Sequence, residues 1–229
     1  MPLLPGPMPI DVVLRRSARA RRVSLRVSSL DGTVTLTLPP RTREADALAF
    51  AQSRADWIRA AVARMPKMHR VTHGTLLPLE GVLTRLDPGP ARGTVRREAG
   101  ALIVPGPADQ AGRRVAAYLR ALARDRLAVA CDRYAAQIGR AHSGLTLRDT
   151  RSRWGSCTAA GGLMFSWRLI LAPPDVLDYV AAHEVAHLAQ MNHSPAFWAE
   201  VARLMPGYAT RRRWLKAEGG ALHAWRFGD

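Results

Sequence analysis

The chain has 229 residues, of which 48% are hydrophobic and 23% are charged, a balance that is ordinary for a globular protein. Its 34 lysines and arginines outnumber 18 acidic residues, and the formal net charge of +16 attracts nucleic acid, anionic surfaces and acidic proteins without indicating a fold. The two cysteines lie in separate segments and do not indicate a disulfide framework. No run approaches the roughly 20 apolar residues of a membrane span.

The first ten residues contain prolines where a secretory signal peptide has its apolar run, and they lack a basic start. Together with two cysteines that fit a reducing compartment, this predicts a soluble cytoplasmic protein with no membrane partner. The sequence does not indicate an oligomeric state.

Alternating apolar residues predict antiparallel strands near the N-terminus. The run from Arg21 to Ser28 alternates clearly, Asp31-Gly32 is a hairpin signal, and a second alternating run ends at Pro39. With a looser strand from Asp11 to Ser17, we expect a three-stranded antiparallel sheet. Its basic face could contact phosphates, although such arginines are more often only the solvated face of a sheet: Arg15, Arg16, Arg19, Arg21 and Arg22.

One helix is expected from Arg43 to about Arg64, because apolar residues recur there at helical spacing. Gly74 to Val104 contains short strand-like runs, with a hairpin signal at Ala99-Gly100. The sequence therefore predicts an N-terminal β-rich region with one helix over residues 1–105.

Residues 106–229 are expected to form a second domain, which begins with one long helix from Pro107 to Gln137. Three strands follow at Leu145–Arg148, Arg153–Cys157 and Leu163–Leu171, and the last two form a hairpin that leads into another helix. The predicted fold class is α+β: N-terminal antiparallel hairpins and a helix, then a zincin-like lobe with a hairpin packed on the histidine helix.

The helix expected from Pro174 to Gln190 carries the pattern H-E-x-x-H. Residues four apart share one helix face, so His183 and His187 can bind one metal ion, and Glu184 beside them suits a base acting on metal-bound water. The alternative, a buried helix with incidental histidines, would bury two unpaired imidazoles and a carboxylate at considerable cost. We expect a zinc site whose three protein ligands leave a position for water.

The third ligand requires the chain to turn after the helix. Asn192 tolerates the left-handed conformation that ends helices, and Ser194-Pro195 is a good start for the next one, which leaves His193 at the corner. The alternative third ligand is Glu200. Gln190 stands where the H-E-x-x-H-x-x-G-x-x-H pattern has glycine, so the chain does not fit the metzincins.

Other candidates carry weaker signals. Tyr208 could donate to the developing oxyanion, although packing is the favoured role, and Cys157 is better explained as a small buried residue than as a ligand. A peptide could add as a strand beside Gly155, but an ordinary internal strand explains that segment equally well. Phe197 and Trp198 are expected to pack under the metal site, and the remaining histidines to lie at the surface: His69, His73, His142 and His223.

Four segments together resemble the YgjP-like metallopeptidase family: Arg153-Trp-Gly-Ser-Cys157, Phe165-Ser-Trp-Arg-Leu-Ile170, the histidine helix with Asp178-Tyr179-Val180 before it, and Asn192-His-Ser-Pro195 with Phe197-Trp198. The resemblance is strongest from Thr146 to Lys216 and weaker toward the N-terminus. It implies a zinc-dependent hydrolase, a peptidase, with His183, His187 and His193 as metal ligands and Glu184 as the base.

Two functions of different classes follow from these observations. The first is a zinc metallopeptidase that acts on protein or peptide substrates. The second is a basic nucleic-acid-binding protein in which zinc only holds the fold, and a hybrid is a peptidase recruited to proteins bound on nucleic acid. Glu184 favours the enzyme, because a structural zinc site does not need a carboxylate beside its ligands.

Overall fold

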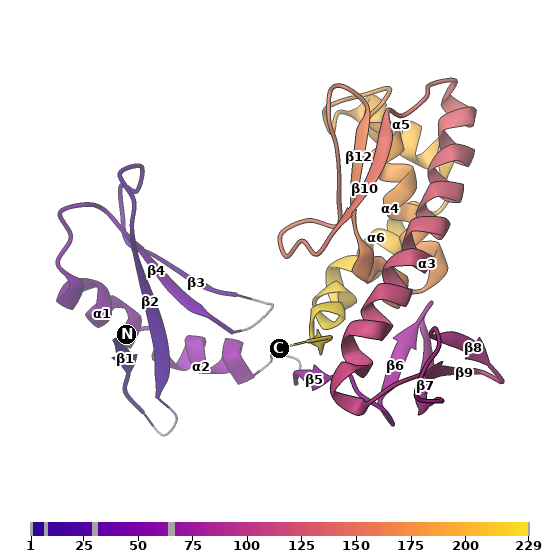
Figure 1. Ribbon diagram of the computed structural model, residues 1–229. Helices are drawn as coiled ribbons and strands as arrows, with labels where there is room; N and C mark the ends of the chain where they lie inside the picture. Colours follow the sequence, from indigo (N-terminus) through magenta and orange to yellow (C-terminus); the bar gives the residue numbers. More distant parts are fainter. Residues whose placement is uncertain (1, 7–8, 29–31, 64–66, 229) are drawn as a thin grey trace. The chain divides into compact units, whose positions relative to one another are not determined.

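The computed structural model describes residues 2–6, 9–28, 32–63 and 67–228 (Figure 1). The chain divides into two compact units, Met1–Lys67 and Met68–Asp229, here called the N-terminal and C-terminal units. The fold class is α+β, as the sequence predicted. The predicted boundary between residues 105 and 106 lies inside the C-terminal unit.

The N-terminal unit contains one sheet in the order β1-β2-β4-β3, built from β1 (Leu3–Leu4), β2 (Ile10–Arg16), β3 (Ser24–Val27) and β4 (Val34–Leu38). The predicted antiparallel pairing of β3 with β4 is confirmed, although part of its Asp31-Gly32 turn lies outside the described residues. The expected all-antiparallel arrangement is wrong, because β2 pairs in parallel with β4. Alternation shows which face of a strand is buried, but not which strand lies beside it.

Two helices, α1 (Glu44–Gln52) and α2 (Ala55–Ala63), replace the single helix expected in this unit. The break lies at Ser53, whose hydroxyl donates to the carbonyl of Phe50 at 2.8 Å, and the Arg54 N–H donates to Ala51 at 3.0 Å. Such a turn ends the α-helical hydrogen-bond pattern. Both helices contribute to the core beneath the sheet, since Ala51 and Ile58 are fully buried with Leu36.

The C-terminal unit contains β5 (His69–Arg70), β6 (Leu76–Leu79), β7 (Val82–Pro88), β8 (Arg96–Glu98), β9 (Ala101–Val104), α3 (Ala108–Ile138), β10 (Gly144–Arg148), β11 (Gly155–Cys157), β12 (Gly162–Ser166), the 3-10 helix η1 (Trp167–Leu171), α4 (Pro174–Ala186), α5 (Pro195–Leu204), α6 (Tyr208–Glu218), the 3-10 helix η2 (Gly219–His223) and β13 (Trp225–Arg226). The long helix α3 confirms its prediction and ends at Gly139, whose φ of 65° gives the left-handed cap.

No helix within the described ranges is long and apolar enough to cross a membrane.

A four-stranded sheet, ordered β6-β7-β9-β8, lies at the N-terminal end of α3 (Figure 1). The predicted hairpin is confirmed: β8 and β9 pair antiparallel across Ala99 and Gly100, whose φ angles of 47° and 80° suit a tight turn. Leu77, Leu86 and Leu102 from this sheet are fully buried in the same core as the helices. This shared core explains why the chain does not divide near residue 105.

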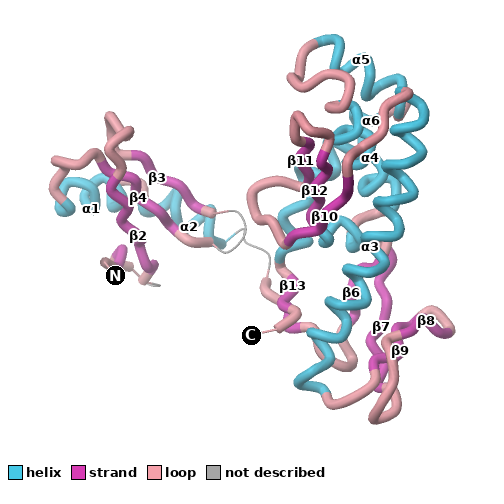
Figure 2. The backbone as a smooth tube through the Cα atoms, turned by 45° about the horizontal axis from the view of Figure 1, so that its top comes forward, coloured by secondary structure: helices cyan, strands magenta, loops and turns pink. Residues whose placement is uncertain are grey.

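A second sheet, ordered β10-β12-β11, lies further along α3, and Figure 2 shows its three strands side by side. The predicted β11–β12 hairpin is confirmed. The last expected strand is too long, because Trp167–Leu171 forms η1, a 3-10 turn whose side chains are all buried. A mostly apolar run indicates burial but does not distinguish a strand from a helical turn. The edge strand β11 contacts α4, the helix that carries the histidines.

Candidate metal centre

Among the α-helices of the C-terminal unit, α4, which carries the histidines, has the largest share of buried residues. It follows Pro173 and has Pro174 in its first turn, where the missing N–H of proline is not needed. The helix ends at Ala186, earlier than the expected end near Gln190, and His187 is its C-cap. The Gln190 N–H still donates to the Ala186 carbonyl at 3.0 Å, so the chain makes one further turn before it leaves the axis.

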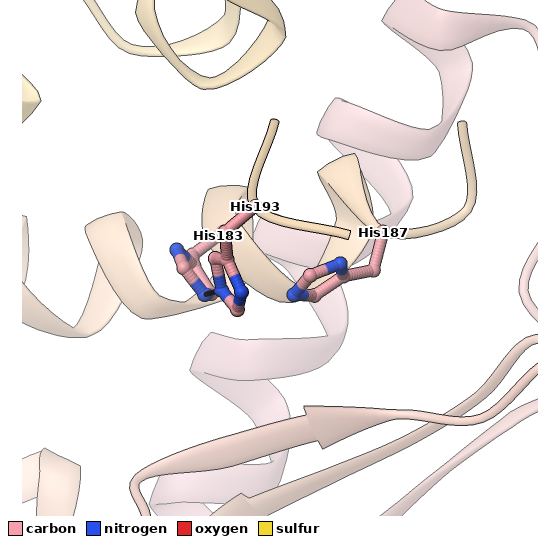
Figure 3. Close-up of side chains that lie close together, drawn as sticks. All are labelled: His183, His187 and His193. Carbon is pink, nitrogen blue, oxygen red and sulfur yellow. Dashed lines mark hydrogen bonds between the residues drawn. The ribbon is translucent and has the colours of Figure 1, made fainter. Parts of the chain in front are cut away.

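Three histidines come together at this turn. His183 and His187 extend from α4, and the loop after the helix brings His193 back toward them (Figure 3). One ligand nitrogen of each lies within 4.8 Å of the others, and the Nε2 atoms of His183 and His193 are 3.1 Å apart. In a tetrahedral zinc site, Zn–N bonds of 2.0–2.1 Å place two nitrogens roughly 3.3 Å apart, close to this separation.

The start of α5 fixes the position of His193. Ser194 caps this helix by accepting the Phe197 N–H at 3.3 Å, and Pro195 is the first helical residue, as the sequence predicted. The alternative ligand Glu200 is turned to another partner. It accepts two hydrogen bonds from Arg203, at 2.6 and 3.1 Å, which lower the pKa of its carboxyl group. The structure therefore brings His193, and not Glu200, to the pair on α4.

Neighbouring groups orient the three rings. Nδ1 of His187 lies 3.0 Å from the Gln190 carbonyl, which can only accept, so Nδ1 carries the proton and the Nε2 lone pair is free to bind a cation. Phe197 stacks on His187 with 4.4 Å between ring centroids, and Trp198 lies 5.7 Å from both His183 and His193. The predicted packing of these aromatic residues against the site is confirmed.

Apart from the contact of its Nε2 with His193, His183 is held by packing against the described residues around it. Its Nδ1 is buried without a hydrogen-bond partner among the described atoms, and the rings of Tyr179 and Phe197 lie 6.0 and 4.9 Å away. Burial, followed by the other two histidines and Arg212, lowers its pKa to about 3. Burial likewise lowers the pKa of His187. Both rings are therefore neutral at pH 7, as metal ligation requires.

Glu184 lies beside the cluster and is only 6% exposed. Burial raises the pKa of its carboxyl group to about 7, with the positive charge of Arg153 acting in the opposite direction. Its side chain passes next to Gly155 of β11, where a Cβ atom would lie 2.5 Å from Glu184 Oε1. The space at Gly155 is thus occupied by this carboxylate. The sequence had left two explanations of Gly155 open, close approach of a substrate backbone and an ordinary internal strand.

The other sequence-predicted candidates lie outside the cluster. Tyr208 stacks between Tyr179 and Trp198, with centroid distances of 6.2 and 5.5 Å. Cys157 is partly buried, and its Sγ donates to the Thr158 carbonyl at 3.4 Å. The remaining histidines have partners elsewhere: His69 on Trp225, His73 at the Val104 carbonyl, His142 at Asp132 and His223 on Trp154.

Two features near the cluster were missed by sequence reasoning. Arg133 and Tyr134 of α3 both donate to Asp178, at 2.6 to 2.7 Å, and so attach α3 to the helix that carries the histidines. Arg212 of α6 lies 4.5 Å above the Trp198 ring. The only sequence signal for Arg212 was the basic run Arg211-Arg-Arg213, and a basic run is more often a solvated surface.

A protein-family model matches most of the chain. The model of the family described as YgjP-like, metallopeptidase domain, matches residues 21–218. No curated protein matches the chain. Among solved structures, the metallopeptidase zymogen of Pyrococcus abyssi abylysin is 18% identical, with 40% of this chain and 93% of that chain covered and a TM-score of 0.36. Because the family model covers most of its length, this chain belongs to the YgjP-like metallopeptidase family and is a peptidase with a candidate metal site of three histidines.

Proposed function

We propose that this chain hydrolyses peptide bonds in proteins or peptides, with Zn²⁺ held by His183, His187 and His193 and with Glu184 as general base. The convergence of three imidazoles within 4.8 Å carries this proposal. Imidazole nitrogen donors with a buried carboxylate beside them suit a catalytic zinc ion. When bound there, zinc supplies a Lewis acid that polarises the scissile carbonyl and lowers the pKa of the attacking water.

The carboxylate of Glu184 supplies the proton transfers. It takes a proton from the attacking water as the water oxygen bonds to the carbonyl carbon, and it gives that proton to the amide nitrogen as the C–N bond breaks. A base works best when its pKa lies near the operating pH, and burial raises the pKa of Glu184 to about 7. Burial of the side chain also keeps the carboxylate apart from bulk water.

The edge of the sheet beside Glu184 offers a place for the substrate backbone. Strand β11 is an edge strand of the described sheet, and Gly155 brings its backbone directly against the Glu184 side chain. An extended peptide that pairs with such an edge is held by main-chain hydrogen bonds. A substrate bound in this way would pass next to the general base.

The proposal is tested with the full chain, loaded with zinc and incubated with an unbiased peptide library. We expect internal cleavage that stops on chelation and returns when zinc is added. Zinc content is measured in the same samples. A folded, zinc-bound protein that cleaves none of the varied peptides would favour a structural zinc site.

A second candidate function is recruitment of the peptidase to nucleic acid. Several exposed arginines on β2, on β3 and in the loop between them have no hydrogen-bond or ion-pair partner among the described residues: Arg15, Arg19, Arg21, Arg22 and Arg26. The strand register places Arg15 opposite Thr37 and Arg26 opposite Thr35, on the sheet face that points away from the buried Leu36. Free cationic side chains on an open sheet favour a polyanion.

This second function predicts salt-dependent binding of DNA. Replacing Arg15, Arg22 and Arg26 with glutamine should weaken binding and reduce the slope of log K against log salt by up to about three. The matched control removes the same charge from exposed arginines of the C-terminal unit, Arg92, Arg113 and Arg148. Equal losses in the two triple variants would show only a general effect of net charge.

A further inference from the structure

A groove of about 560 Å³ lies next to the histidine cluster, along helix α6. Its chemistry is aromatic and cationic: besides two aliphatic side chains, it is lined by Trp154, Tyr179, Tyr208, Arg212, Arg213 and Lys216. No carboxylate is among the described residues that line it. A concave surface with charge of one sign concentrates ligands of the opposite sign.

Aromatic rings connect the groove to the cluster. Tyr179 and Tyr208 stack with 6.2 Å between centroids, and Tyr208 stacks in turn on Trp198 at 5.5 Å. Tyr179 lies 6.0 Å from His183, and Trp198 lies 5.7 Å from the same ring. Only the ring of Tyr179, which lines the groove, would therefore separate a ligand in the groove from His183.

Arg212 stands out among the cations of α6. Its guanidinium is 4.5 Å above the Trp198 ring and has no hydrogen-bond or ion-pair partner within the described part of the chain. The neighbouring Arg211, by contrast, donates to Asp175 at 2.9 Å. Stacking on an aromatic face orients a guanidinium while its N–H groups stay available for a carboxylate.

We propose that this groove binds a carboxylate of the peptide substrate and that Arg212 determines this specificity. The inference rests on the proposed peptidase function and names its substrate class: peptides that carry an acidic group near the scissile bond. The planar guanidinium suits bidentate contact with a carboxylate, while the tyrosine and tryptophan rings contact the apolar part of the bound residue. The carboxylate can belong to an acidic side chain or to the C-terminus of the peptide.

The direct test measures binding without turnover. Two pairs of labelled peptides are used: one pair differs only by Glu or Gln, and the other only by a free or amidated C-terminus. Each peptide is titrated into zinc-loaded E184Q and into metal-free parent protein, and binding is measured by fluorescence anisotropy. We expect the carboxylate peptide to bind about tenfold tighter, which corresponds to about 1.4 kcal/mol. The pair that shows the difference identifies the source of the carboxylate. Equal binding in both pairs would overturn the inference.

Variants assign the effect to Arg212. R212Q should remove the preference for the carboxylate, and R212K should restore part of it, because lysine keeps the charge and loses the bidentate geometry. R113Q removes an exposed charge from α3 and should keep the parental preference. An unchanged preference in R212Q would refute the assignment.

Turnover separates this inference from the proposed function. If the zinc-loaded parent cleaves peptides with equal kcat/KM in both pairs, Glu against Gln and free against amidated C-terminus, the groove inference fails and the peptidase function stands. If it cleaves no peptide but still binds acidic peptides through Arg212, the peptidase function fails and the carboxylate site stands.

Discussion

A Cβ atom at Gly155 would lie 2.5 Å from both Cγ and Oε1 of Glu184, and real Cβ atoms essentially never approach other atoms within 3.0 Å. The missing side chain at position 155 is therefore what allows the Glu184 carboxylate to lie against strand β11. Since Glu184 is the proposed general base, a backbone position on the neighbouring strand controls where that base can be.

The variant G155A tests this relationship. The added methyl group should displace the Glu184 carboxylate, and a shift of about 1 Å at a reacting group lowers the rate by about 100-fold. We expect kcat to fall while zinc content and the circular dichroism spectrum stay parental. G228A is the control, because its Cβ would meet only Arg113 at 3.8 Å, an ordinary contact. Parental kcat in G155A would show that Glu184 does not depend on this space.

Zinc affinity distinguishes the two candidates for the third ligand. H193A should bind zinc at least about 100-fold more weakly, because loss of a ligand exceeds the effect of losing one of its supporting hydrogen bonds. E200A should keep parental affinity, since Glu200 is paired with Arg203. Competition with a chelator of known affinity measures both. If E200A released zinc and H193A retained it, Glu200 and not His193 would be the third ligand.

Asp178 is expected to be important for stability. It accepts hydrogen bonds from Arg133 and from the Tyr134 hydroxyl, so D178A leaves a partly buried donor on α3 without its partner. We expect a loss of about 1–3 kcal/mol in the free energy of unfolding, measured with urea. D132A removes the exposed partner of His142 and should cost less than about 1 kcal/mol. Equal losses in the two variants would contradict this role.

His223 makes the stability of the protein sensitive to acid. Burial, followed by the charge of Arg168, lowers its pKa from 6.5 to about 4. Because the folded state resists protonation of this ring, the unfolded state binds more protons at pH values between about 4 and 6.5. The free energy of unfolding therefore falls as the pH drops from about 6.5 toward 4. Above pH 7 the ring is neutral in both states and this effect disappears.

Comparison of parent and H223Q isolates this titration. Both metal-free proteins are unfolded with urea across pH 4 to 8. We expect the parent to have the higher free energy of unfolding, by an amount that is constant above pH 7 and shrinks toward pH 4. Metal-free protein is used because acid also displaces zinc from histidines. A difference between parent and variant that does not change with pH would contradict the proposed origin of the acid sensitivity.

Features that depend on local chemistry were predictable from the sequence. The spacing of His183 and His187 follows from the helix repeat, and Ser194-Pro195 correctly indicated where α5 begins. That local signal was enough to place His193 at the turn beside the pair on α4. The hairpin at Ala99-Gly100 was likewise predictable from its glycine, because glycine readily adopts the positive φ that such a turn requires.

Features that depend on packing between distant segments were not predictable in the same way. Alternation in β2 gave no sign that its neighbour would be β4. The mostly apolar run at Trp167–Leu171 can be buried equally well as a strand or as a turn. The contact of Gly155 with Glu184 and the position of Arg212 above Trp198 arise only when β11 and α6 pack beside α4 and α5. Single-sequence patterns do not contain that information.

Zinc content and peptide hydrolysis, measured together on parent and E184Q protein, test the central claim most directly. We expect E184Q to keep the parental amount of zinc and to lose hydrolysis by at least about 100-fold, because glutamine cannot accept the proton of the attacking water. Parental hydrolysis by zinc-bound E184Q would contradict the account.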